Sequence, residues 1–283
     1  MSDYMWFEGI PLPLVVCESE VMREIHDKFE VRNEDIVILT YPKSGTNWLS
    51  EIVCLIQTKG DPKWIQSMPT WDCLPWIEYI FGYLKLKDQK GPHLIRSHLP
   101  IQLFPKSFFS SNAKVIYLIR NPRDVLVSGY FFWSNSNYFK NLEPLEHYFE
   151  WFIKGNGERV LNTGTYGTFR FFNCRHGCLY LRPTLNSAGL LPYLNPLDPA
   201  QKDFMDSVIP AEAYHDTRGT IQKICQFLGK KLEPEELDSV LKHSSFQAMS
   251  ENNMSNFKII PRRTDVSDLL LLRKGKKKYP VPE

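Results

Sequence analysis

Little in this sequence points to a membrane, a secreted scaffold or a nucleic acid. No apolar run approaches the ~20 residues of a membrane span, and the amino end carries no basic leader. The six cysteines form no dense framework among 283 residues, which argues against a disulfide-stapled secreted domain. The formal net charge is only +2, so the overall charge gives no indication that the protein binds nucleic acid or a membrane surface. These absences predict a cytoplasmic protein without nucleic-acid or membrane partners.

Two familiar ligand-binding patterns are also missing. The phosphate loop Gly-x-x-x-x-Gly-Lys-Ser/Thr does not occur, and no acidic partner for a magnesium ion is evident, so a nucleotide kinase-like phosphotransferase is disfavoured. Cys174 and Cys178 flank Arg-His-Gly, but no second pair of ligands stands at a familiar zinc spacing. We therefore expect no metal ion in this protein.

The chain is long and apolar enough for a large core, with 283 residues of which 43% are hydrophobic. Apolar, β-branched runs predict strands at 36–39, 94–95 and 114–119, and apolar periodicity predicts a helix that begins near Thr46 and another at 125–133. Alternating strands and helices predict an α/β fold with a parallel sheet flanked by helices and a P-loop-like nucleotide-binding core. We expect a single domain over residues 1–283.

Other segments are predicted from proline and from apolar periodicity. Helices are expected at 144–155 and 220–228, and a third from Glu233. Residues 61–82 alternate large aromatic side chains with prolines, which predicts irregular loops. Their rings belong either to the core or to the wall of an apolar pocket.

The run Thr40-Tyr-Pro-Lys-Ser-Gly-Thr-Asn-Trp48 joins the first strand to its helix. A helix N-terminus offers unpaired N–H groups and a partial positive charge. Lys43 adds a full charge, and Gly45 lets the backbone approach an anion closely. The pattern predicts a phosphate site, with an ordinary strand–turn–helix and a solvated lysine as the alternative.

Within this run each residue offers a different contact. The N–H groups of Ser44, Gly45, Thr46 and Asn47 and the Thr46 hydroxyl are expected to cradle the anion. Trp48 offers a flat face on which a base could stack.

Two further charged side chains follow the other predicted strands. His98 comes after the strand at 94–95, and Arg120 comes after the strand at 114–119. Because ligands of parallel sheets bind beyond the carboxyl ends of strands, we expect Lys43, His98 and Arg120 to converge at one edge. Histidine can serve as a general base near neutral pH, although a lone histidine is more often structural. The guanidinium fork suits phosphate, with an ion pair to Asp124 as the alternative.

Several strings resemble one family. YPKSGTNW resembles the phosphosulfate-binding loop of cytosolic sulfotransferases, RNPRDVLVS resembles their 3′-phosphate motif, and SHLP resembles their catalytic-histidine segment. The opening MWFEGIPLP has the style of the hydroxysteroid or alcohol branch, and the likeness covers residues 1–156 and about 216–256. The resemblance implies sulfuryl transfer from PAPS, the family's sulfate donor, to a hydroxyl on a small hydrophobic alcohol of the steroid or bile-acid type.

The resemblance also implies a role for each matching residue. His98 would be the base, and Lys43 would contact the leaving phosphate. Trp48 would stack on adenine, and Arg120 with Ser128 would hold the 3′-phosphate. Arg96, two residues before His98, either supports the sulfuryl group or is a solvated arginine. Further nucleotide contacts are implied at Ser244, Ser245, Arg273, Lys274 and Gly275.

Two departures from the family set the alternatives. Residues 157–215 do not resemble it, and the Gly-Asp-Trp-Lys continuation after Gly275 is missing. In the family that continuation closes the nucleotide site and holds the dimer contact, so the usual homodimer is not expected here. The alternative function is a catalytically impaired relative that binds PAPS or its product PAP.

Overall fold

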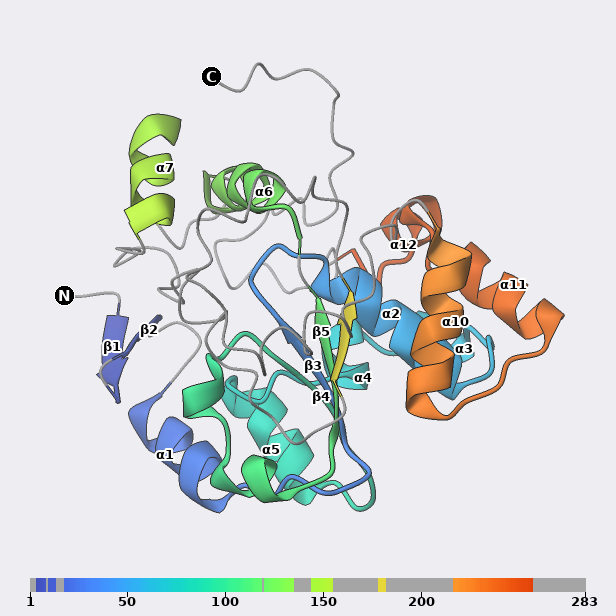
Figure 1. Cartoon of the computed structure of the whole chain (residues 1–283), viewed down its shortest axis with the longest axis horizontal. Helices are drawn as coiled ribbons and strands as arrows, with labels where there is room; N and C mark the ends of the chain where they lie inside the picture. The colour runs from blue at the N-terminus through green and yellow to red at the C-terminus, as the bar shows by residue number, and fades with distance from the viewer. Residues whose placement is uncertain are drawn as a thin grey trace, which may run out of the picture.

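The computed structural model describes residues 4–8, 10–13, 18–118, 120–134, 144–154, 178–181 and 216–256. At the centre of these residues lies a parallel sheet with strand order β4-β3-β5-β6 (Figure 1). Its strands are β3 (Ile36–Thr40), β4 (Leu94–Ser97), β5 (Lys114–Leu118) and β6 (Cys178–Leu181). The predicted α/β architecture with a parallel sheet is confirmed.

Strand β3 lies between β4 and β5, and its apolar side chains suit an inner strand with both faces covered. All five residues are buried, as expected for a parallel strand covered by helices on both sides. Side chains alternate across the sheet, so Val37 and Leu39 join one core cluster while Ile36 and Ile38 join the other.

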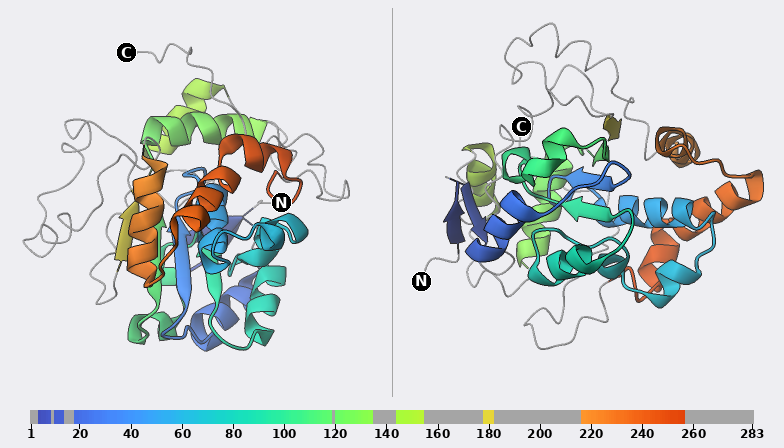
Figure 2. Two further views of the ribbon diagram at one scale, coloured as in Figure 1. Left: turned by 90° about the vertical axis from the view of Figure 1, so that its right-hand side faces the viewer. Right: turned by 90° about the horizontal axis from the view of Figure 1, so that it is seen from below.

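The helices form two layers on the sheet (Figures 1 and 2). The layer built on Val37 and Leu39 contains α1 (Ser19–Lys28) and α5 (Ile80–Asp88), with the 3-10 turns η1 (Ile101–Leu103) and η2 (Lys106–Ser110). The opposite layer contains α2 (Thr46–Gln57), α10 (Thr217–Leu228) and α11 (Pro234–His243). Helix α6 (Pro122–Ser134) follows β5 and packs against α7 (Leu145–Lys154).

The expectation of irregular loops at 61–82 is wrong. The segment contains α3 (Lys63–Ser67) and α4 (Thr70–Cys73), and α5 begins within it. Pro62 and Pro69 stand directly before α3 and α4. Proline is tolerated at a helix start because the N–H it lacks would be unpaired there. The prolines therefore begin helices rather than exclude them.

Two smaller elements complete the described chain. Strands β1 (Tyr4–Phe7) and β2 (Ile10–Pro13) form an antiparallel hairpin. Helix α12 (Phe246–Glu251) follows α11. No helix in the described ranges is long and apolar enough to cross a membrane.

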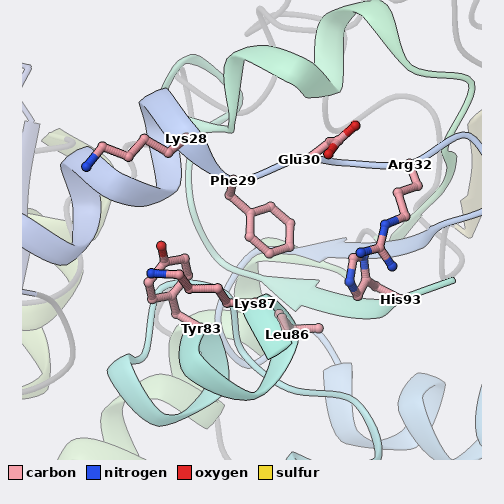
Figure 3. Close-up of a pocket in the computed structure, with 8 residues that line it drawn as sticks. All are labelled: Lys28, Phe29, Glu30, Arg32, Tyr83, Leu86, Lys87 and His93. Carbon is pink, nitrogen blue, oxygen red and sulfur yellow. The ribbon is translucent and has the colours of Figure 1, made fainter. Parts of the chain in front are cut away.

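At the amino edge of the sheet, a buried carboxylate holds two strands. Asp35 Oδ1 accepts the His93 N–H at 2.7 Å, and Asp35 Oδ2 lies 2.9 Å from His93 Nδ1. A pocket of about 200 Å³ opens beside them, between Phe29, Tyr83 and His93 (Figure 3). It lies at the edge opposite to the carboxyl ends of the strands, so it is separate from the loop that follows β3.

Candidate active site

The loop between β3 and α2 has the backbone geometry of an anion cradle. Gly45 directly precedes α2 with a φ of 112°, and Lys43 has a φ of 68°. The first value favours glycine strongly, because a Cβ at this φ is strained. No side chain caps the start of α2. The N-terminus of α2 therefore presents the positive end of the helix to the loop. The expectation that the Ser44 N–H joins the anion cradle is wrong, because this group donates to the Tyr41 carbonyl oxygen at 3.1 Å.

Lys43 and Arg120 lie side by side, as the sequence predicts. Arg120 Nη1 donates to the Lys43 carbonyl oxygen at 2.9 Å, and Lys43 Nζ lies 3.7 Å from the centroid of the Phe132 ring. Burial, followed by the charge of Arg120, lowers the pKa of Lys43 to about 7. Arg120 Nε also lies 3.9 Å from Asp124 Oδ2. This pair is long and exposed, so it contributes little and does not occupy the guanidinium.

His98 is held in one tautomer. Its Nδ1 lies 2.7 Å from the Thr40 carbonyl oxygen and 3.1 Å from the Thr40 hydroxyl. Because a carbonyl oxygen only accepts, Nδ1 carries the hydrogen and Nε2 carries the lone pair. The ring also packs against Trp76, with 4.3 Å between centroids. The hydroxyls of Thr40 and Thr46 lie 2.6 Å apart and connect this histidine to the first residue of α2.

The environment keeps His98 neutral. Burial is the main cause that lowers its pKa; the hydrogen bond to Thr40 opposes it, the charges of Arg96 and Lys43 add to it, and the net result is a pKa of about 3. A neutral imidazole with a free Nε2 can accept a proton. The structure thus places a base, a cation and a helix N-terminus at one edge of the sheet.

Arg96 is not a solvated arginine. Its side chain is 0% exposed, its Nη1 donates to Asn47 Oδ1 at 2.8 Å, and its guanidinium carbon lies 4.4 Å from the centroid of the Trp76 ring. It pairs with Ile38 in the register of β3 and β4, on the face of the sheet that packs against α2. Arg96 therefore supports the loop between β3 and α2 through its hydrogen bond to Asn47.

The remaining predicted residues are placed as follows. Trp48 packs partly against the core, and Ser128 lies on α6. Ser244 Oγ donates to the Val240 carbonyl oxygen at 2.7 Å, and Ser245 Oγ caps α12 by accepting the Ala248 N–H at 3.2 Å. Both serine hydroxyls thus serve the helix ends locally. Arg273, Lys274 and Gly275 lie outside the described residues.

Sequence reasoning missed a buried carboxyl behind the loop. Glu51 on α2 is 0% exposed. Its Oε1 accepts from the Thr70 hydroxyl at 3.3 Å and from the Ser255 hydroxyl. Burial raises its pKa to about 7. Charge at this position on an otherwise apolar helix was the available signal.

Replacing Glu51 with glutamine is expected to stabilise the fold more at pH 8.5 than at pH 5.5. Because its folded pKa is raised from 4.5 to about 7, the stability associated with the protonated carboxyl is complete below pH 4.5. That stability is lost as pH rises through about 7, and the variant avoids the loss. We expect a gain of about 1–3 kcal/mol in the free energy of unfolding at pH 8.5, measured by urea unfolding.

The control is Glu20→Gln, at an exposed position. A gain independent of pH would contradict the prediction.

Fold and site together define an α/β protein with a P-loop-like phosphate-binding turn. The sequence model of the family described as "Sulfotransferase domain" matches residues 33–165 and 212–279. The chain therefore belongs to the sulfotransferase family and is an enzyme of that class. The interval without a match, 166–211, lies inside the segment 157–215 that departs from the family pattern.

Named relatives agree with this assignment. The chain is 56% identical to Sulfotransferase 2A6 of Mus musculus over 275 residues, which cover 97% of this chain and 87% of the relative. It is 52% identical to Sulfotransferase 2A1 of Homo sapiens and to a 3-alpha-hydroxysteroid sulfotransferase of Cavia porcellus, with the same shares covered.

Solved structures share the fold. Mouse sulfotransferase SULT7A1 complexed with PAP matches with a TM-score of 0.66 and 22% identity, over 98% of this chain and 86% of that one. Retinol dehydratase in complex with androsterone and PAP matches with a TM-score of 0.65 and 19% identity, over 94% and 79%. Among the described residues, no group of His, Cys, Asp and Glu side chains is arranged to hold a metal ion.

Proposed function

We propose that this protein transfers a sulfuryl group from PAPS to the hydroxyl of a small hydrophobic alcohol of the steroid type, in the cytoplasm. One observation carries the proposal: Lys43, His98 and Arg120 follow three adjacent parallel strands and meet at one edge. The acceptor class is supported by the hydroxysteroid sulfotransferase among the relatives. The donor is supported by the nucleotide in the similar structures, both of which hold PAP.

The nucleotide is bound through charge and helix N–H groups in this proposal. Lys43 and the N–H groups at the start of α2 face the phosphosulfate end. Arg120 and Ser128 contact the 3′-phosphate, for which a guanidinium fork is well suited. Trp48 contacts the adenine. Contacts from Ser244, Ser245 and the 273–275 triplet stay predictions.

The reaction follows from the two groups that flank the reacting atoms. His98 Nε2 accepts the proton of the acceptor hydroxyl while its oxygen forms a bond to sulfur. The bond between sulfur and the bridging phosphate oxygen breaks, and negative charge develops on that oxygen. Lys43 stabilises this charge as an ammonium ion, because bound phosphates raise its lowered pKa again.

A thermal-shift assay with PAP tests the proposed function. At a concentration of about 100 Kd, PAP is expected to stabilise the protein by about 2.7 kcal/mol, while ATP with magnesium has little effect. The reverse order would favour a kinase-like enzyme. Binding of PAP without sulfation of any steroid, phenol or simple alcohol would favour a catalytically impaired relative.

A further inference from the structure

Glu78 is a buried acid that the proposed reaction does not yet use. It follows a stretch that runs beside β4: the Ile77 N–H donates to the Arg96 carbonyl at 3.2 Å, and the Arg96 N–H donates to the Pro75 carbonyl at 3.1 Å. This pairing, centred on the bridge between Trp76 and Arg96, fixes the backbone next to Glu78. The Glu78 side chain therefore lies next to the turn that follows β4.

The Glu78 carboxyl contacts the main chain of His98. Its Oε1 accepts the His98 N–H at 2.7 Å, and the side chain is 3% exposed. Burial raises the pKa of Glu78 to about 7, although the His98 and Glu78 N–H groups, the Ser97 hydroxyl and the Arg96 charge all favour its ionised form. A short bond in a buried site is costly to lose, because the N–H would be left unpaired.

His98 is consequently fixed at two separate points. Thr40 holds the ring through Nδ1 at 2.7 Å, and Glu78 holds the peptide N–H at the same distance. The ring contact sets the tautomer, whereas the backbone contact sets where the side chain starts. Both are needed to aim Nε2, because a displacement of about 1 Å at a reacting group can cost on the order of 100-fold in rate.

We propose that Glu78 is a positioning residue for His98: its carboxyl anchors the turn after β4 so that the imidazole meets the reacting hydroxyl. The inference rests on the proposed function. Glu78 contacts His98 directly, whereas it reaches the nucleotide loop indirectly, through the charge of Arg96. Its loss should therefore lower kcat and change PAP binding little.

The fold supplies a matched control at the other end of the same strand. Asp35 accepts the N–H of His93 at 2.7 Å and is 0% exposed. This is the same contact, a buried carboxyl to a histidine N–H, at the edge without the candidate site. Asp35→Asn keeps one acceptor oxygen but replaces the other, which accepts the Arg32 N–H at 2.9 Å, with a donor. It reports the cost of disturbing a buried carboxyl when no reacting group depends on it.

The experiment compares Glu78→Met, Glu78→Gln and Asp35→Asn in the full chain. Glu78→Met is expected to lower kcat by about 10–100-fold with the Kd of PAP within about twofold of the wild-type value. Glu78→Gln keeps a carbonyl oxygen as acceptor, so it should retain kcat within about threefold. Asp35→Asn should lower stability without lowering kcat.

Several results would overturn the proposal. They are a wild-type kcat in Glu78→Met, a loss in Glu78→Gln as large as in Glu78→Met, or an equal loss of kcat in Asp35→Asn. If Glu78→Met does not fold, Glu78→Asp, which withdraws the oxygen by one methylene, should show the same loss of kcat with normal PAP affinity, and a normal kcat would refute positioning.

Failure of the proposed function is recognised separately. If the wild type binds PAP but sulfates no acceptor, nitrogen NMR of the His98 ring tests positioning without turnover. The wild type should show a hydrogen on Nδ1 alone, and Glu78→Met should show a shifted Nδ1 resonance, because displacement of the turn lengthens the hydrogen bond from Nδ1 to the Thr40 carbonyl oxygen. An unchanged spectrum in the variant would refute the role of Glu78.

Discussion

Replacing His98 with asparagine is expected to lower kcat for sulfuryl transfer by about 10²–10⁴-fold, the range in which a general base contributes. The amide nitrogen of asparagine can still donate to the Thr40 carbonyl, which now lies 2.7 Å from His98 Nδ1. The variant therefore keeps the hydrogen bond that fixes the side chain but lacks a group that can accept a proton at Nε2. PAP affinity should stay within about threefold, because nucleotide contacts lie on the other two loops.

The measurement is kcat under saturating PAPS and acceptor, with PAP affinity from calorimetry. His26→Asn is the matched control, since His26 lies on α1, where its Nδ1 is 3.0 Å from Asp27 Oδ1, and it should leave kcat unchanged. More than a tenth of wild-type kcat in His98→Asn would rule out His98 as the base.

Replacing Lys43 with methionine is expected to weaken PAP binding by about 10–100-fold and to lower kcat by about 10²–10³-fold. The larger effect on kcat reflects charge that develops only as the sulfur–oxygen bond breaks. The lowered pKa of about 7 adds a distinctive signature. At pH 8.5 the free protein holds Lys43 neutral, and bound phosphate restores its charge, so binding takes up close to one proton.

Calorimetry in two buffers of different ionisation heat measures this proton uptake. Lys43→Met should show no such uptake. Lys43→Arg should bind PAP without it, because arginine is already charged at this pH. Lys63→Met, at an exposed position at the start of α3, is the control and should behave as the wild type. Proton uptake that persists in Lys43→Met would place the titrating group elsewhere.

The sheet and the charged edge could be predicted because their signals are local. A β-branched apolar run, a loop with Lys and Gly, and a periodic helix place β3, its turn and α2 without knowledge of distant contacts. The rule that parallel strands present their carboxyl ends together then places His98 and Arg120. The structure agrees with each of these steps.

The buried polar groups could not be predicted in the same way. Arg96, Glu51 and Glu78 are charged residues that composition assigns to the surface, yet each is at most 3% exposed. Their partners Asn47, Thr70 and His98 belong to other elements, so only the tertiary arrangement determines them. The hairpin β1-β2 was missed for a different reason: its prolines argue against a strand, but they are tolerated on an edge.

The hydrogen bond between Glu51 and Ser255 bears on how this enzyme is made in the cell. The two partners are 204 residues apart in the sequence, and ribosomes add roughly 5–20 residues per second. The apolar face of α2 that α10 and α11 cover therefore waits on the order of 10–40 s for its partners during translation. During that interval the nascent chain exposes the apolar face of α2. The yield of folded protein should therefore depend on chaperones that shield such surfaces until the last quarter of the polypeptide emerges.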